Sequence, residues 1–588
     1  MKARGKNGSY FSRLIGGSRI WSRFFSVDSV SSHRENGSLR EENMFSQSLL
    51  GSLYGTAARF AARARNFCAS YAEKSKIFSA LSSFFRGLMD TSVSSVGVFL
   101  FFTAMYSAAM YVVKLYAGRP ADTFDLIYSV VIALMGIFLL PVRRSLLGCV
   151  RQGILTSYIT EEMLAVSSFV LDTEKPGKKH VGWAVLFGTV AGLAGFLFSP
   201  LDIVLFLLAV ALVAVIMYSP EGGLYISAFL LPFVPPYVSA SVAVLAGISY
   251  LLKLLVGKRN FYLTTADIFV FLFTLAMGAA GITTPFGSEN TAVTVLTVAV
   301  LYILCVNLMR SGDQLFRLMR ALNSGALMLA LCCIFSFFFP DELGAFGAAV
   351  SEKINYVTML PLLLPASLCV TFGRGAFSSG LITVFAIYMA VALTFSEWLY
   401  IAAIVITVLF LVSSFRKRVG IILGGALSVG GVMVLFGTGI IKGEMLNVTL
   451  GSAAETATAW KYAPWGIGFG EKAFNFAFRS TGYGDAVPTD LYSAITVAGG
   501  VLSLLLFAVM LTLLLRRGMS VMKGKTVKIF KYPAAAALSA VCAFVLYGFF
   551  GGIWALFANI LLFAVTCGCM SCLPRVYERE VGEEYEIK

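Results

Sequence analysis

The chain has 588 residues, of which 58% are hydrophobic and only 13% are charged, and its mean hydropathy is +0.82. A water-soluble protein cannot bury so much apolar surface, so this composition excludes one and predicts a polytopic membrane protein. The net charge of +15 would suggest a nucleic-acid partner for a soluble protein. In a membrane protein it is expected from basic cytoplasmic loops, so we expect no nucleic-acid partner.

Residues 1–90 form a basic N-terminal region without an apolar run long enough to cross a bilayer. From Phe60 to Leu88, apolar residues recur at spacings of three, four and seven, flanked by Arg and Lys. This pattern predicts a basic amphipathic helix. Two positions fit it equally well: on an anionic inner leaflet of the bilayer, or packed on the protein's own cytoplasmic loops.

Apolar segments fill most of the remaining chain and lack the alternation of barrel strands. They predict an all-α polytopic integral membrane protein with about 16 transmembrane helices. Their centres lie near residues 103, 132, 190, 210, 230, 247, 275, 299, 330, 364, 386, 405, 430, 504, 542 and 562. Because Pro232, Pro235 and Pro236 interrupt the pair near 230 and 247, a re-entrant or kinked unit is an alternative there.

The distribution of basic residues predicts the orientation of these helices. With both termini inside, nearly all of the 46 Lys and Arg residues fall on the cytoplasmic side, as the positive-inside rule expects. The exceptions are Lys114, Arg119, Lys353, Lys442, Lys461, Lys472 and Arg479. The predicted regions are therefore a helix bundle over 91–441, a large extracytoplasmic loop over 442–492, further transmembrane helices over 493–573 and a cytoplasmic tail over 574–588. The predicted location is an inner or cytoplasmic membrane.

The predicted outer loop contains the glycine-spaced stretch "APWGIGFG", residues 463–470. Glycines permit tight turns and let backbone amides approach a ligand closely. Aromatic residues such as Trp465 can stack on sugar rings or lie among lipid headgroups. The composition alone also fits an ordinary interfacial loop.

The order of features over roughly residues 360–515 resembles the O-antigen ligase and Wzy-type polysaccharide polymerase family. In that family a long outer loop carries a proline and a glycine-spaced stretch, matched here by Pro464, Gly466, Gly468, Gly470 and Phe474. The next span begins with a His-Asn-x-aromatic pattern and has a glycine further on, and Tyr492 and Gly499 match the aromatic residue and the glycine.

The resemblance implies metal-independent glycosyl transfer on the outer face, in cell-surface polysaccharide synthesis. The donor would be an oligosaccharide linked to polyprenyl pyrophosphate, and the lipid pyrophosphate would be released. A polymerase passes the growing chain to another lipid-linked repeat unit, whereas a ligase passes it to a different acceptor. No metal and no cofactor are expected. The implied partners are the lipid-linked oligosaccharide, a bilayer with an anionic inner leaflet and other polysaccharide-assembly proteins.

Two departures from the family pattern affect the expected mechanism. Thr489 and Asp490 stand where the ligase pattern has His-Asn, and Glu397 stands where the family commonly has Arg. The two histidines, His33 and His180, are both predicted to be cytoplasmic. A base on the outer face must then be a carboxylate, which favours a polymerase over a ligase.

Three residues are the predicted catalytic groups. Arg479 would hold the pyrophosphate, because its planar fork suits phosphate oxygens. Asp490 and Glu397 would act as base or orient the acceptor. The predicted substrate-binding residues are Lys461, Lys472, Trp465, Gly466, Gly468, Gly470 and Tyr492. For each charged residue the alternative is a solvated loop charge or a mutual ion pair.

Two other functions fit the same sequence. A transporter or flippase for lipid-linked saccharide would use many spans and a proline-broken segment, although the sequence shows no internal repeat. A degenerate family member would bind the lipid-linked glycan without turning it over. A charged cavity reaching both faces would favour transport, and a one-sided outer cavity would favour transfer.

Overall fold

The structure is a computed structural model. It describes residues 91–118, 123–142, 180–255, 259, 261–283, 290–338, 357–373, 377–394, 397–415, 466, 491–523, 528–548 and 557–586. The chain divides into two compact units, and all of the described helices belong to the second, apart from Lys523 at the end of one helix. The amphipathic helix predicted over 60–88 lies outside the described residues.

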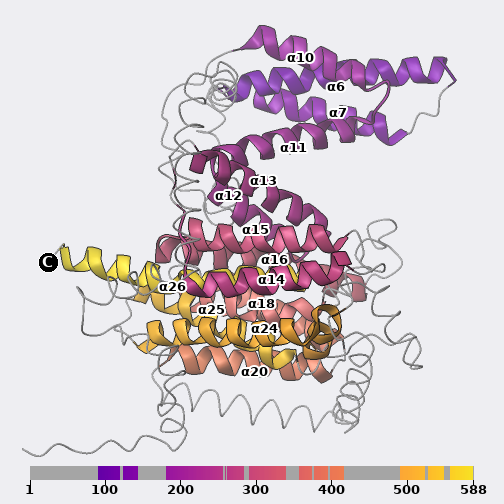
Figure 1. Cartoon of the computed structure of the whole chain (residues 1–588). Coiled ribbons are helices and arrows are strands. Elements are labelled where there is room, and N and C mark those ends of the chain that lie inside the picture. The colour runs from indigo at the N-terminus through magenta and orange to yellow at the C-terminus, as the bar shows by residue number, and fades with distance from the viewer. Residues whose placement is uncertain are drawn as a thin grey trace, which may run out of the picture. The chain divides into compact units, whose positions relative to one another are not determined.

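Fifteen α-helices lie in the described residues (Figure 1). They are α6 (Val93–Tyr116), α7 (Thr123–Leu139), α10 (Val181–Ala194), α11 (Pro200–Tyr218), α12 (Pro220–Leu230), α13 (Pro236–Leu255), α14 (Thr265–Thr283), α15 (Asn290–Leu308), α16 (Gly312–Phe338), α18 (Met359–Phe372), α19 (Phe377–Leu393), α20 (Glu397–Ser414), α24 (Leu491–Lys523), α25 (Lys528–Tyr547) and α26 (Phe557–Glu586).

Six of these helices are long and apolar enough to cross a membrane, and several shorter apolar helices accompany them. The chain is therefore an all-α, multi-pass membrane protein, as the composition predicts. Every predicted segment centre except the one near residue 430, which lies outside the described residues, falls inside a described helix.

Helices α7 and α10 both pack on α6, and they do so through small residues. A Cβ atom on Gly136 of α7 would lie 2.8 Å from the backbone nitrogen of Phe101 in α6. On the other side of α6, a Cβ on Gly192 of α10 would lie 2.7 Å from the carbonyl of Thr103. Such close backbone approach is how membrane helices gain packing contacts when burial from water no longer drives them together.

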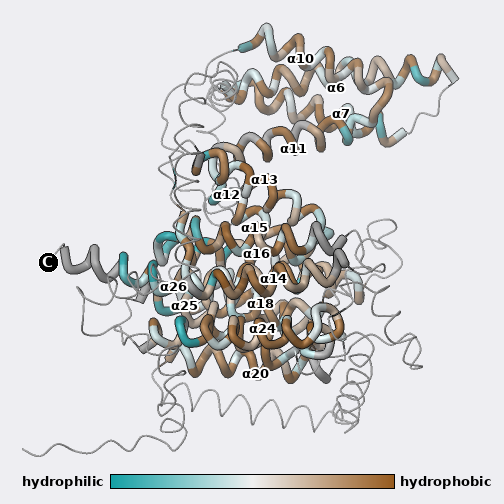
Figure 2. The backbone as a smooth tube through the Cα atoms, in the orientation of Figure 1, coloured by the Kyte–Doolittle hydropathy of each residue, from teal (hydrophilic) through white to brown (hydrophobic). Residues whose placement is uncertain are grey.

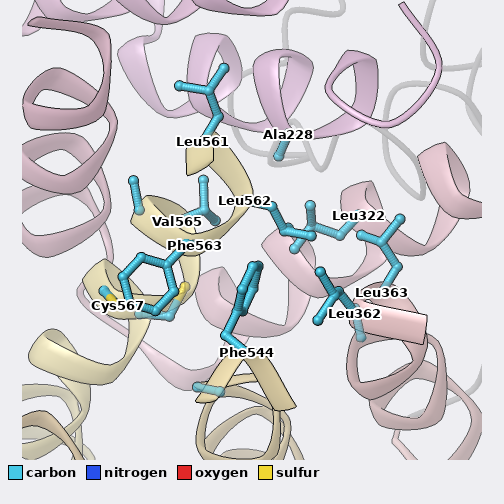
Figure 3. Close-up of a cluster of buried hydrophobic side chains, with 14 of the residues drawn as sticks. Ala228, Leu322, Leu362, Leu363, Phe544, Leu561, Leu562, Phe563, Val565 and Cys567 are labelled. Atoms are coloured by element: carbon cyan, nitrogen blue, oxygen red, sulfur yellow. The ribbon is translucent and has the colours of Figure 1, made fainter. Parts of the chain in front are cut away.

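Helix α26 lies at the centre of the larger group of helices. Its side chains meet residues from α12, α16, α18 and α25, and Figure 3 shows Leu561, Leu562 and Phe563 among them. The ring of Phe563 lies 5.1 Å from that of Phe544 in α25, at an interplanar angle of 65°. This edge-to-face contact is a favoured aromatic geometry, so the core is specifically packed rather than merely apolar.

The proline-rich pair α12 and α13 forms a short hairpin. Helix α12 has 11 residues, about 16 Å, which is only about half of a bilayer's apolar thickness. Buried Ser227 and Ser239 bridge the two helices, each donating its hydroxyl to the other's carbonyl at 3.0 and 2.8 Å. The turn places Pro232 against Gly325, the midpoint of α16. Helix α12 is too short to cross a membrane alone, whereas α13 is long and apolar enough to do so, so the choice between a re-entrant and a kinked unit stays open.

Basic residues from segments far apart in sequence meet at one end of the bundle. Arg517 of α24 donates to the hydroxyl of Thr264, directly before α14, at 2.6 Å. Arg575 of α26 donates to the carbonyl of Met309, between α15 and α16, at 2.8 Å. Figure 2 shows hydrophilic residues gathered beside α25 and α26 at this end, which we call the basic end. The predicted topology places these same segments on one side of the membrane.

Candidate functional site

Helix α24 is broken at Gly500. This residue has φ 71° and ψ −179°, a backbone conformation that glycine adopts far more readily than other residues, and helix continues on both sides of it. Buried Ser503 donates its hydroxyl to the carbonyl of Gly499, directly before the break, at 2.7 Å. Non-helical backbone inside a membrane is tolerated where protein buries it or where it lines a cavity. Broken helices of this kind hold substrates and ions in transporters.

Gly466, from the stretch "APWGIGFG", packs directly on this break. Its φ is +86°, and a Cβ atom there would lie 2.5 Å from the carbonyl of Ala498 and 2.6 Å from the Cα of Gly499. Gly499 in turn lies against the sulfur of Met277 in α14. Position 466 therefore requires glycine, both for its backbone conformation and for the contact. Two glycines that the family resemblance matches separately are neighbours in space.

A partly open apolar cavity lies between α14, α15, α24 and α26, and its empty volume of ≈ 500 Å³ includes the open space at its mouth. At one end it is lined by Met277, which also touches Gly499, and at the other by Tyr302. Its remaining lining residues are Val270, Phe273, Thr274, Thr294, Val295, Val298, Met510, Ile560, Phe563, Ala564 and Cys567. The lining is almost wholly hydrocarbon, so the cavity suits an apolar chain rather than a sugar.

A buried carboxylate lies beyond the Tyr302 end of the cavity. Asp267 is 1% exposed, and its Oδ1 accepts hydrogen bonds from Tyr302 Oη at 2.5 Å and Ser571 Oγ at 2.6 Å. Its Oδ2 accepts from the backbone nitrogen and the hydroxyl of Thr264, both at 2.6 Å. Arg517 donates to Thr264 and, at 3.3 Å, to Ser571. Both carboxylate oxygens of Asp267 accept hydrogen bonds, and the Arg517 guanidinium is linked to them through Thr264 and Ser571. A buried acidic group requires such partners.

Tyr492, a predicted substrate-binding residue, is half-buried near the start of α24. Its hydroxyl donates to the carbonyl of Val545 in α25 at 2.8 Å, and its ring meets Phe507 edge-on. The backbone nitrogen of Leu491 also donates to the carbonyl of Gly548 at 2.7 Å. These contacts tie the start of α24 to the end of α25, opposite the basic end.

Glu397, a predicted catalytic residue, is the first residue of α20. That helix ends near Phe415, whose ring contacts Phe372 at 5.3 Å, and Phe372 also stacks on Tyr532 at the start of α25. Because α20 ends where α25 begins, Glu397 lies at the end of the bundle where α25 ends and α24 starts. Asp490 directly precedes α24 in the chain but lies outside the described residues, so its proximity to Glu397 stays a prediction.

The other predicted site residues lie outside the described residues, namely Arg479, Asp490, Lys461, Lys472, Trp465, Gly468 and Gly470. Sequence reasoning missed Gly500, Met277 and the Asp267 network. The pair "GG" at Gly499 and Gly500 was a signal for a break, although glycine is common in membrane helices. Asp267 gave a weaker signal, because an acidic residue in the first turn of a helix is ordinary.

In the part of the chain that the structure describes, no group of three or more His, Cys, Asp or Glu side chains is arranged to hold a metal ion. No model of a known protein family matches the chain, and no curated protein matches it. The resemblance to the O-antigen ligase and polymerase family stays a prediction from the residues that carry it.

Proposed function

We propose that the protein transfers glycosyl units from a polyprenyl-pyrophosphate-linked saccharide on the outer face of an inner or cytoplasmic membrane, as a repeat-unit polymerase. The proposal includes about sixteen spans with both termini inside. The observation that carries it is the contact of Gly466 with Gly499 at the break in α24. This contact joins the glycine-spaced stretch of the predicted loop to α24. An active site formed by the loop over the helix ends would require such a contact.

The apolar cavity supports the lipid-linked character of the donor. A polyprenyl pyrophosphate has a long hydrocarbon tail and a strongly charged headgroup, so its site needs an apolar channel beside a polar one. The cavity reaches Met277, which touches Gly499 beneath the loop glycine. A tail in this cavity would leave the pyrophosphate near the start of α24, where the chain carries Asp490 and, earlier in the loop, Arg479.

In the proposed reaction, the acceptor hydroxyl attacks the anomeric carbon of the donor sugar and forms the new glycosidic bond. The bond from that carbon to the pyrophosphate oxygen breaks, and polyprenyl pyrophosphate leaves with the electron pair. Arg479 stabilises the charge that develops on the pyrophosphate. Asp490 or Glu397 accepts the proton of the acceptor hydroxyl.

The test is Arg479→Ala in the native host, with polysaccharide length read on a gel beside the level of the protein in the membrane. We expect long chains to disappear and single repeat units to accumulate while the protein level is unchanged. The matched control is Lys353→Ala, which removes another predicted outward cation outside the loop and should leave chain length unchanged. Unchanged chain length in Arg479→Ala would contradict the proposed role of this residue.

Gly466→Ala tests the contact on which the proposal rests. Alanine at φ +86° costs about 1–2 kcal/mol, and its methyl group would also overlap the Ala498 carbonyl. We expect shortened chains in this variant, with the protein still present in the membrane. Normal chain length with a normal protein level would show that the loop contact is not needed for polymerisation.

Transport of lipid-linked saccharide is the second candidate, and one observation favours it. The cavity lies between the α24 break and the Tyr302–Asp267 pair, so polar groups occur beyond both ends of an apolar space. A flippase mutant would leave lipid-linked units on the cytoplasmic face, whereas a polymerase mutant would leave them on the outer face. Labelling of those units by a membrane-impermeant reagent in cells that lack the protein separates the two functions.

A further inference from the structure

Arg310 lies between α15 and α16 at the basic end and holds an incompletely satisfied guanidinium. Its Nε and Nη2 atoms are buried, yet they form no hydrogen bond with any residue that the structure describes. Its backbone nitrogen donates to Gln314 Oε1 at 2.7 Å, which fixes the main chain at this corner. Buried donors are rarely left unpaired, and those of a charged group least of all.

The charges around Arg310 do not neutralise it. Arg259 lies nearby and forms an ion pair with Glu221, so that pair contributes no net charge. Burial first, and the neighbouring Arg259 second, lower the pKa of the Arg310 guanidinium. Arg575 adds another cation in the same region, held by the carbonyl of Met309. The described groups therefore carry an excess of positive charge around two unused donors.

Exposed aromatic residues lie beside this cluster of arginines. Arg575 lies over the ring of Tyr262, with its guanidinium carbon 4.7 Å from the ring centroid. Phe261 and Tyr262 are each 42% exposed at the start of the segment leading into α14. Exposed aromatic residues beside arginines are typical of the membrane–water interface.

We propose that Arg310, together with Arg259 and Arg575, forms a binding site for a phosphate-bearing anion at the basic end of the bundle. The guanidinium fork matches two phosphate oxygens, and the two unused nitrogens of Arg310 supply the donors. The phosphate belongs either to the headgroup of an anionic phospholipid or to free phosphate. This site is at the opposite end from the proposed transfer reaction and does not depend on it.

The experiment measures thermal unfolding of the full-length protein in mild detergent, with phosphatidylglycerol in one titration and inorganic phosphate in another. For the wild-type protein we expect the unfolding midpoint to rise with the anion, because a ligand that binds the folded state stabilises it. Arg310→Gln should bind about tenfold more weakly or worse, because it loses charge-assisted hydrogen bonds. Arg310→Lys should be intermediate, because it keeps the charge without the fork.

The behaviour without added anion supplies an independent check. Removing a charged group whose Nε and Nη2 donors are buried and unpaired should leave Arg310→Gln at least as stable as the wild type when no anion is present. Arg317→Gln is the matched control, since it also removes one positive charge, in this case from α16, where Arg317 forms an ion pair with Asp313. A response to phosphatidylglycerol alone identifies a lipid headgroup, and a response to both probes extends the site to free phosphate. Equal responses of wild type and Arg310→Gln, or a destabilised anion-free Arg310→Gln, would overturn the proposal.

Discussion

The most apolar stretches of helices α6 and α26 have nearly the same mean hydropathy, but they are buried to very different extents. In the most apolar stretch of α26, 89% of the residues are buried in the protein, whereas in that of α6 the share is 22%. Helix α26 is surrounded by side chains from its neighbours, while α6 contacts α7 and α10 through glycines and leaves Val112 and Val113 exposed. Hydropathy thus marks both as membrane helices but does not distinguish a central helix from a peripheral one.

The physical reason is that lipid tails are as apolar as a protein core. A membrane helix has no need for an apolar stripe on one face, because every face meets hydrocarbon. The exposed residues of the N-terminal helices include large ones, among them Phe138, at 77% exposure. Contact with lipid is an ordinary environment for such side chains in a membrane protein. The difference between the two regions therefore lies in packing rather than in polarity.

The largest expected effect comes from comparing two phenylalanines. Phe563→Ala in α26 removes a ring that contacts Phe507 and Phe544 and also lines the cavity, and we expect a loss of about 3–5 kcal/mol in the free energy of unfolding. Phe138→Ala in α7 exchanges one lipid-facing apolar group for a smaller one and should change stability little. Unfolding in mixed micelles measures both. Equal losses would mean that Phe138 is packed against protein, which would break the comparison.

Charge patterns predict long-range neighbours better than apolar patterns do. The positive-inside rule groups Arg259, Arg310 and Arg517 on one side, and the structure brings their segments together at the basic end. Basic side chains are expensive in hydrocarbon and so mark helix ends, and the rule assigns those ends to one side of the membrane. The positions of the helix centres followed from the apolar runs, and all of them but the one near residue 430 fall inside described helices. The number of spans and their orientation stay predictions.

The candidate site could be predicted only in part. The motif glycines Gly466 and Gly499 were chosen from the resemblance, and their contact depends on the tertiary fold. The break at Gly500 was not predicted, since a glycine inside a membrane helix is as often a packing residue as a break. The bonds of Asp267 to Tyr302 and Ser571 link α14, α15 and α26, and no local pattern encodes such pairings.

Two aspartates, Asp267 and Asp202, form a second pair. We expect a smaller difference in the free energy of unfolding between their variants than between the two phenylalanine variants. Asp267→Asn puts an amide group where the carboxylate accepts four hydrogen bonds, so at least one buried donor would face another donor. We expect a loss of about 2–3 kcal/mol in the free energy of unfolding. Asp202→Asn changes an exposed residue in the capping box of α11. We expect this variant to lose less than about 1 kcal/mol in the free energy of unfolding. Matching losses in the two variants would contradict the buried network.

The smallest expected difference in stability is between variants of two glycines, one of which is tightly packed and the other surrounded by open space. A methyl group on Gly568 of α26 would lie 2.5 Å from the Cβ of Cys305 in α15, so Gly568→Ala must push the two helices apart. We expect a loss of about 1–2 kcal/mol in the free energy of unfolding. Gly182→Ala at the start of α10 meets open space and should change stability by no more than about 0.5 kcal/mol. If Gly568→Ala were equally neutral, α15 and α26 would be free to separate, and the central helix would be held no more tightly than the peripheral ones.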